Sequence, residues 1–276
     1  MGSPVFSYIH WHPDPELFRI GGLGVRYYSL LFAAGIIIAY LLLKKSLLQQ
    51  KIPVAVLDKL LIYVVIGTFL GARLGHCLFY EPGYYLHHPL EIFIPWSSTT
   101  EGIRFTGYQG LASHGAALGI LLSAWIYARK YHFPYMVILD TIAPYIPLAG
   151  AVIRLGNLFN SEIIGRPTRV PWAFVFDRVD QVPRHPAQLY ESICYFALFL
   201  FLYRYSLRKK TTQQKGLLFS LLLTILFSIR FLLEFFKADQ EAFEAGMLIN
   251  MGQLLSLPLI AAGIILLFQR KKLFGA

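Results

Sequence analysis

Seven long apolar runs constrain the fold of this 276-residue chain more than any other feature of its sequence. A helix needs about 20 apolar residues to cross the roughly 30 Å hydrocarbon core of a bilayer, and each run approaches or reaches that length. The pattern predicts an all-α integral membrane protein that forms a single polytopic membrane domain over residues 1–276. The predicted transmembrane helices lie at about 27–43, 60–80, 107–128, 135–153, 186–203, 216–236 and 245–269.

The composition agrees with this class and excludes others. Hydrophobic residues make up 56% of the chain and charged residues only 14%, whereas soluble proteins carry about 25% charged residues. The formal net charge of +10 does not indicate a nucleic-acid partner, because the basic residues form short clusters between apolar runs. Cys77 and Cys194 lie inside apolar runs, so no disulfide framework is expected. Residues 1–22 lack the apolar core of a cleavable signal peptide.

The loops between the runs predict the orientation. Every second loop, beginning with the one after the first run, is rich in Lys and Arg and nearly free of acidic residues. The positive-inside rule assigns these loops to the cytoplasm, which puts the N-terminus outside and the C-terminus inside. The longer outer loops, 81–106 and 156–185, predict a small irregular extracytoplasmic head. Within it, Trp172 to Phe176 is a candidate short strand.

Polar residues within the runs gather at one depth. A charged group in the bilayer core costs about 2.5–3.5 kcal/mol or more, so it usually faces a partner or a wet cavity. With these spans, all but one of the polar groups map to the outer half of the membrane, and Asp140 is the exception near the inner face. The outer set is Arg73, His76, His114, Arg154, Gln188, Tyr190, Glu191, Arg230, Glu234 and Gln253.

Two interpretations of this set stay open. The charges can pair to hold helices together, and Arg230 and Glu234 are suitably spaced at i, i+4. If those two pair with each other, Arg73 and Arg154 still need an anion. A lipid phosphate in the outer leaflet is the obvious one, because guanidinium presents a planar fork of donors to phosphate.

Three segments hold the densest polar groups. Residues 154–165 combine glycines, which let the backbone approach a ligand closely, with asparagines and Glu162, although a glycine helix cap is the ordinary alternative for Gly156 or Gly165. Residues 111–119 place His114 among small residues, which either serve helix packing or surround a group of near-neutral pKa. Residues 185–191 are partly architectural, because proline is favoured at a helix start.

These motifs together resemble those of the bacterial prolipoprotein diacylglyceryl transferase family over nearly the whole chain. The main signature is Arg154-Leu-Gly-Asn-Leu-Phe-Asn-Ser-Glu-Ile-Ile-Gly165. The others, in similar order, are Tyr27-Tyr28-Ser-Leu, Gly71-Ala-Arg-Leu-Gly75, Ser113-His-Gly115, His185-Pro-Ala-Gln-Leu-Tyr-Glu191, Arg230-Phe-Leu-Leu-Glu-Phe-Phe236 and Met251-Gly-Gln-Leu-Leu-Ser256. The sequence departs from the family pattern at Ile153, often glycine; at Asn160-Ser161, often Asn-Gly; and at Lys237, often arginine.

The resemblance implies a reaction and its partners. The diacylglyceryl group of phosphatidylglycerol passes to the lipobox cysteine in the signal peptide of a prolipoprotein, in the bacterial inner membrane. The product is a thioether, and glycerol phosphate leaves. With the residue-level interpretation, it implies catalytic roles for His114, Arg230 and Tyr28. It implies phosphatidylglycerol binding by Arg154, Asn157, Arg73, Asn160, Glu162 and Gly165, supported by Glu234, Gln188, Tyr190, Glu191 and Gln253.

The residues are suited to this chemistry. A thiol of pKa near 8.5 must lose its proton to attack carbon, and arginines can stabilise a departing phosphate. Either His114 or Arg230 can activate the thiol, and the sequence does not choose between them. No metal or other cofactor is expected, because metal-ligand motifs are missing from the sequence.

Two other functions remain as alternatives. An outer-leaflet lipid or anion transporter would use the same arginine cavity, but it needs access from both sides and therefore polar groups through the full depth. A structural membrane scaffold would leave the buried arginines unexplained.

Overall fold

The computed structural model describes residues 8–20, 23–49, 54–79, 81–94, 96–99, 102–105, 112–208, 214–239, 244 and 246–274. The chain divides into two compact units. The larger unit consists of Met1–Lys45 and Leu139–Ala276, and the smaller unit consists of Ser46–Ile138.

The chain is a predominantly helical, multi-pass membrane protein. Among the described residues, five helices are long and apolar enough to cross a bilayer: Tyr27–Leu48, Asp58–Leu78, Tyr135–Asn160, Leu217–Phe236 and Met251–Phe274. The other two predicted spans form the long helices α4 (Ser113–Lys130) and α7 (Ala187–Ser206). Both are less apolar, because α4 ends in two cations and α7 carries Gln188 and Glu191. Their passage through the membrane stays a prediction.

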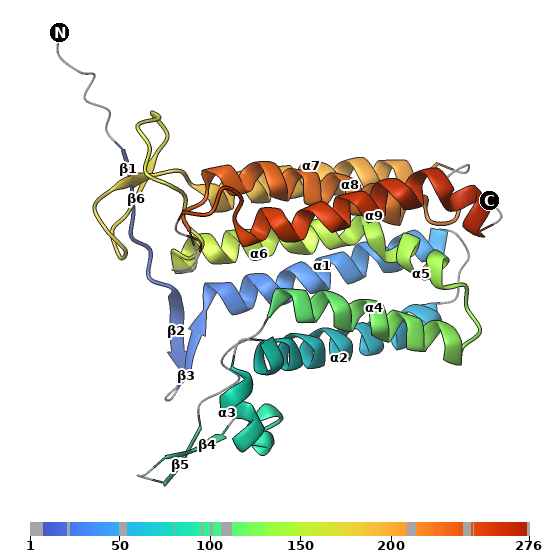
Figure 1. Cartoon of the computed structure of the whole chain (residues 1–276), viewed down its shortest axis with the longest axis horizontal. Helices are drawn as coiled ribbons and strands as arrows, with labels where there is room; N and C mark the ends of the chain where they lie inside the picture. Colours follow the sequence, from blue (N-terminus) through green and yellow to red (C-terminus); the bar gives the residue numbers. More distant parts are fainter. Residues whose placement is uncertain are drawn as a thin grey trace. The chain divides into compact units, whose positions relative to one another are not determined.

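The larger unit is built on five long helices, which run side by side (Figure 1). They are α1 (Tyr27–Gln49), α6 (Ile146–Asn160), α7, α8 (Leu217–Leu233) and α9 (Met251–Phe274). The short helix α5 (Tyr135–Ile142) precedes α6, and the 3₁₀ turn η3 (Glu234–Phe236) follows α8.

The ends of these helices determine where the predicted site residues can meet. A Cβ on Gly156 of α6 would lie 2.9 Å from the Tyr28 ring of α1, and a Cβ on Gly252 of α9 would lie 2.6 Å from the Glu234 carboxyl carbon. The starts of α1 and α9 therefore lie beside the ends of α6 and α8, respectively. Most of the predicted site residues of this unit lie at these ends.

A small three-stranded sheet follows the end of α6. Strand β1 (Ile9–Trp11) pairs in parallel with β6 (Phe174–Phe176), and β6 pairs antiparallel with β7 (Pro183–Arg184). Phe174 and Phe176 are buried with Leu158 of α6, and the Trp11 indole donates to the Leu158 carbonyl at 2.8 Å. The predicted strand between Trp172 and Phe176 is confirmed for its last three residues.

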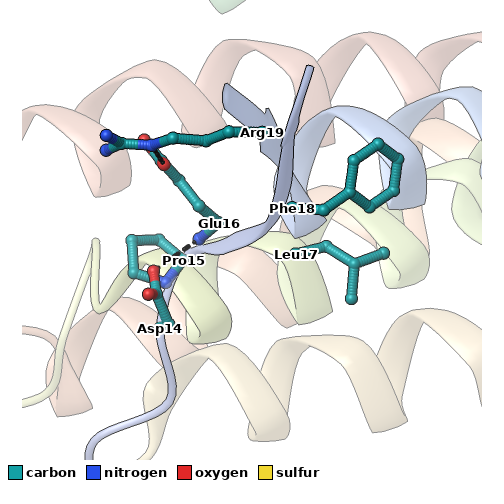
Figure 2. A pocket seen from close by; sticks show the side chains of 6 residues that line it. All are labelled: Asp14, Pro15, Glu16, Leu17, Phe18 and Arg19. Carbon is teal, nitrogen blue, oxygen red and sulfur yellow. Dashed lines mark hydrogen bonds and ion pairs between the residues drawn. The ribbon is translucent and has the colours of Figure 1, made fainter. Parts of the chain in front are cut away.

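A separate hairpin precedes α1. Strands β2 (Glu16–Ile20) and β3 (Leu23–Arg26) pair antiparallel. Figure 2 shows the open pocket along β2, where Glu16 pairs with Arg19 while Leu17 and Phe18 point the other way. This pocket contains none of the predicted site residues.

The structure corrects two helix boundaries. The fourth predicted span, 135–153, is interrupted by the 3₁₀ turn η2 (Ala143–Tyr145), because Pro144 and Pro147 cannot donate helical hydrogen bonds. Helix α6 then continues to Asn160 and ends on Ser161 in the left-handed conformation. The outer loop predicted from residue 156 therefore begins about five residues later, and Asn157 and Asn160 are helical.

The smaller unit centres on the pair α2 (Val54–Phe79) and α4. Gly67, Gly71 and Gly75 of α2 face Gly115 and Gly119 of α4, and a Cβ on Gly119 would lie 1.9 Å from the Gly67 carbonyl oxygen. Small residues allow this backbone contact. Between the two helices in sequence come α3 (Pro82–His87), η1 (Pro89–Ile92) and the hairpin β4 (Trp96–Thr99) and β5 (Gly102–Phe105).

Candidate active site

A buried ion network lies where α6, α7 and α8 end or begin. Glu191, which has no exposed surface, receives the Arg154 Nε at 2.8 Å on one carboxylate oxygen and the Lys237 Nζ at 2.9 Å on the other. Lys237 is also fully buried and lies 2.9 Å from the Glu234 carboxylate. A buried charge is tolerated only when it is paired and hydrogen-bonded, and every member of this chain of four groups is paired.

The network corrects two expectations. Glu234 pairs with Lys237 and not with Arg230, because α8 ends at Leu233 and the 3₁₀ turn η3 breaks the helical i, i+4 spacing. The charge of Arg154 also does not require an external anion, because the Glu191 carboxylate is its partner.

Tyr195 joins Arg230 to the same network. Its hydroxyl donates to the Glu191 carboxylate at 3.2 Å, and the Arg230 guanidinium interacts electrostatically with Tyr195 and Glu191. Among the described residues, three cations therefore surround the two buried carboxylates. The surplus of one positive charge leaves the network suited to an anion.

Close backbone packing brings Lys237 into the protein. Gly165 forms an isolated antiparallel bridge with Lys237, and its N–H donates to the His185 carbonyl at 3.0 Å. A Cβ on Gly165 would lie 2.2 Å from that carbonyl oxygen. Gly165, predicted to bind lipid, is thus required for the approach of three backbone segments.

Side-chain amides form a second cluster beside Arg154. Arg154 Nη1 donates to Asn157 Oδ1 at 3.0 Å, and the NH₂ groups of Asn157 and Asn160 each donate to the Glu162 carboxylate at 3.1 Å. The Gln188 Nε2 donates to the Glu162 carbonyl at 2.6 Å. The structure therefore brings together five residues that the sequence singled out in two separate segments.

Gln253 contributes to a helix cap. Asn250 Oδ1 accepts from the Gln253 N–H at 2.9 Å, and Gln253 Oε1 accepts from the Asn250 N–H at 3.2 Å. This reciprocal pair is a capping box at the start of α9. The cap accounts for a buried glutamine at this position, and a supporting role of Gln253 in lipid binding stays a prediction.

Tyr190 lies in an aromatic group at the start of α7. Trp172 Nε1 donates to the Tyr190 hydroxyl at 2.8 Å, and that hydroxyl lies 3.1 Å from His185 Nδ1. Burial lowers the pKa of the His185 imidazole. A neutral His185 can accept a hydrogen bond from the Tyr190 hydroxyl at Nδ1, which gives a directed chain of two hydrogen bonds.

In the loop before α7, the Arg184 guanidinium holds the pKa of the Asp180 carboxyl below its ordinary value.

Arg73 and His114 belong to the smaller unit. Arg73 is buried, donates to the carbonyls of Glu91 and Ile92 at 2.6 and 3.0 Å, and lies over the Tyr85 ring. These contacts fasten the 3₁₀ turn η1 to α2, and a role in lipid binding stays a prediction. His114 lies in the first turn of α4, and its side chain is outside the described residues.

The comparisons with known proteins decide the family. Residues 15–269 match the prolipoprotein diacylglyceryl transferase family. The chain belongs to this family. It is 49% identical over 264 residues to a phosphatidylglycerol–prolipoprotein diacylglyceryl transferase of Bacteroides fragilis, with 94% of each chain covered.

Two other relatives of that name support the assignment. The Tolumonas auensis protein is 44% identical over 265 residues, which cover 96% of this chain and 98% of the relative. The Chloroherpeton thalassium protein is 45% identical over 267 residues, which cover 96% of each. Membership in a transferase family does not favour the transporter alternative.

Within this diacylglyceryl transferase chain, sequence reasoning missed two contributors to the network. Lys237 is a departure from an arginine of the family pattern, and its spacing of three residues from Glu234 is also a signal for a local ion pair. Tyr195 follows Glu191 by four residues on α7, but tyrosine is common at membrane surfaces, so its position alone gives no signal. Among the described residues, no group of three or more His, Cys, Asp and Glu side chains could hold a metal ion.

Proposed function

We propose that this chain transfers the diacylglyceryl group of phosphatidylglycerol to the thiol of a lipobox cysteine in a prolipoprotein. The observation that carries the proposal is the family match, which spans the Arg154 signature and the buried cationic network around it. The names of the relatives supply both substrates.

The reaction forms a carbon–sulfur bond and breaks the thiol S–H bond and a carbon–oxygen bond, and the thiol proton passes to a general base or to water. The cysteine sulfur forms a bond to the glyceryl carbon that carries the phosphate, and the carbon–oxygen bond to that phosphate breaks. Glycerol phosphate leaves with the bonding electrons and the negative charge. Arg154 and Arg230 bind the phosphate, because the network holds one more cation than carboxylates and can stabilise the charge that develops on the leaving group.

His114 or Arg230 activates the incoming thiol. His114 would do so as a general base, and Arg230 would do so by lowering the thiol pKa through its charge. Tyr28 packs on Gly156, two residues from Arg154 on α6, and is suited to orienting the lipid. Asn157, Asn160 and Glu162 belong to the proposed lipid site, and lipid binding by Arg73 is proposed from the family resemblance alone.

The active site faces the outer leaflet of the bacterial inner membrane in this proposal. Seven spans, with α4 and α7 included, place the basic loops in the cytoplasm and the N-terminus outside. The sheet of β1, β6 and β7 then belongs to an extracytoplasmic head, on the same side as the buried network at the ends of α6 and α8.

The test uses the purified chain in detergent with phosphatidylglycerol and a lipobox peptide. Mass spectrometry should find a diacylglyceryl adduct on the cysteine peptide and none on a peptide with serine in its place. Arg154→Lys should lower transfer strongly, because lysine keeps the charge but loses the planar fork of donors. His114→Gln with full transfer would remove His114 from catalysis. Movement of lipid between leaflets without any adduct would favour a transporter.

A further inference from the structure

Glu162 fixes the direction of three side-chain amides. Its carboxylate accepts from the NH₂ groups of Asn157 and Asn160, and its backbone carbonyl accepts from the NH₂ group of Gln188. An amide NH₂ only donates and the amide oxygen only accepts. Each oxygen must therefore point away from Glu162, and the hydrogen bonds assign the orientation of all three amides.

Only one of these oxygens is satisfied. Asn157 Oδ1 accepts from Arg154 at 3.0 Å. Asn160 Oδ1 and Gln188 Oε1 are buried and have no hydrogen-bond partner among the described residues, and the Gln188 side chain has no exposed surface. Buried acceptors are nearly always paired in folded proteins, because an unpaired one loses its hydrogen bonds to water. The two oxygens therefore require a donor from outside the described chain.

The chemistry of the cluster indicates what that donor is. Arg154, Asn157 and Asn160 follow one another at three-residue intervals on α6, so their backbones span about 9 Å along the helix. These three residues offer the Arg154 cation at one end and the unpaired Asn160 Oδ1 acceptor at the other. Gln188 Oε1 adds a second unpaired acceptor from α7. A ligand that matches this order carries a phosphate and, a few atoms further on, hydroxyl groups.

We infer that Asn160 and Gln188 accept hydrogen bonds from the hydroxyls of the glycerol head group and make the site selective for a polyol phosphate lipid. The inference rests on the proposed function and adds to it a means of recognising the head group. Arg154 binds the phosphate, and the two amide oxygens bind the part of the head group that departs with it. Glu162 acts as a positioning residue, because it orients the acceptors through their NH₂ groups.

The test compares two donor lipids with the same acyl chains. One is phosphatidylglycerol, and the other is phosphatidylpropanol, whose head group lacks both hydroxyls. We expect wild-type kcat/KM for transfer to the lipobox peptide to favour phosphatidylglycerol by about tenfold or more, because a site built for hydroxyls rejects an analogue that leaves its acceptors unpaired.

Two variants then assign the selectivity to the amides. Asn160→Leu and Gln188→Met each replace an amide by an apolar side chain of similar size, so each should lower kcat/KM for phosphatidylglycerol several-fold more than kcat/KM for the propanol lipid. A merely structural role would lower both donors equally and keep their ratio. The matched control is Gln214→Met, which removes an amide oxygen that accepts from Arg270 outside the proposed site and should leave the ratio at the wild-type value.

The outcomes separate this inference from the proposed function. If wild type transfers from both lipids equally, or if both variants keep the wild-type ratio, the two oxygens bind only buried water and the inference is wrong, while the transferase function stands. The comparison of lipids in the wild-type protein needs no variant to fold. Absence of any transfer from phosphatidylglycerol would overturn the proposed function itself.

Discussion

At the scale of single residues, the site depends on how its charges are neutralised. Glu191 and Glu234 are almost fully buried and share Lys237 between them. Removing one partner of a buried ion pair costs far more than the pair contributes, because it leaves an uncompensated charge in a medium of low dielectric. Lys237 therefore matters for folding even without touching a substrate.

Replacing this lysine tests that argument. Lys237→Met should destabilise the protein by about 3–5 kcal/mol, because two buried carboxylates would lose their shared cation. Thermal unfolding in detergent measures the loss. Lys237→Arg should restore most of the stability by restoring the charge. Arg19→Met, which removes an exposed partner of Glu16, should change the unfolding midpoint little. Equal effects of the two methionine variants would contradict the argument.

The His185 imidazole predicts a dependence of stability on pH. Burial lowers its pKa in the folded chain, so below about pH 6.5 the unfolded chain binds more protons than the folded one. The contribution of His185 to the free energy of unfolding should be fully present above about pH 6.5 and should be lost as the pH drops toward the folded-state pKa. His185→Gln should make the thermal unfolding midpoint depend less on pH between about pH 5 and 7. His87→Gln, a change at an exposed histidine, should keep the wild-type slope.

Sequence reasoning identified most members of the site but not their partners. It singled out Arg154, Glu191 and Glu234 because charged groups are costly in a bilayer. It could not pair them, because pairing depends on where η3 interrupts α8 and on the bridge that brings Lys237 beside Gly165. The bridge joins segments about 70 residues apart, and no local pattern specifies it.

At the scale of elements, the segment around Gly165 joins parts of the chain that supply the site. The Gly165 N–H donates to His185, and the next residue, Arg166, donates through its own N–H to the Phe236 carbonyl at 2.9 Å. The segment is therefore held between the residues that precede α7 and those that follow α8. A side chain at position 165 would separate them.

A single methyl group tests this packing. Gly165→Ala should destabilise the protein by about 1–3 kcal/mol or more, because the added Cβ would clash with backbone and not with a movable side chain. Gly83→Ala is the matched control, since nothing lies within 4 Å of a Cβ there and alanine is the better helix former. Thermal unfolding of both variants measures the difference, and an unchanged midpoint for Gly165→Ala would be contrary to expectation.

The helices themselves were predictable to different degrees. Hydropathy located all seven long helices, because about 20 apolar residues in a row have few other uses. It placed the end of α6 too early, since Asn157 and Asn160 look like loop residues until Glu162 is seen to accept from their amides. Polar side chains that are satisfied locally can extend a helix beyond its apolar run.

At the scale of the whole molecule, the proposed orientation can be measured. With seven spans, the loop containing Asp180 faces outward and the end of α9 near Lys272 faces the cytoplasm. In intact cells, an impermeant maleimide should label Asp180→Cys and leave Lys272→Cys unlabelled until the membrane is opened. The natural Cys77 is buried and Cys194 is partly buried, so the parent chain gives the background. Labelling of both positions in intact cells would contradict the three spans predicted between them.

The glycine contact between α2 and α4 has a consequence for how the smaller unit associates. Lipid tails solvate leucine as well as another helix does, so apolar side chains alone do not drive two membrane helices to associate. Here the peptide groups themselves touch, and dispersion between main chains and weak Cα–H···O attraction supply the adhesion. The pair should therefore tolerate many apolar side chains on its outward-facing surfaces, whereas even one added methyl group at the contacting glycines should separate the helices.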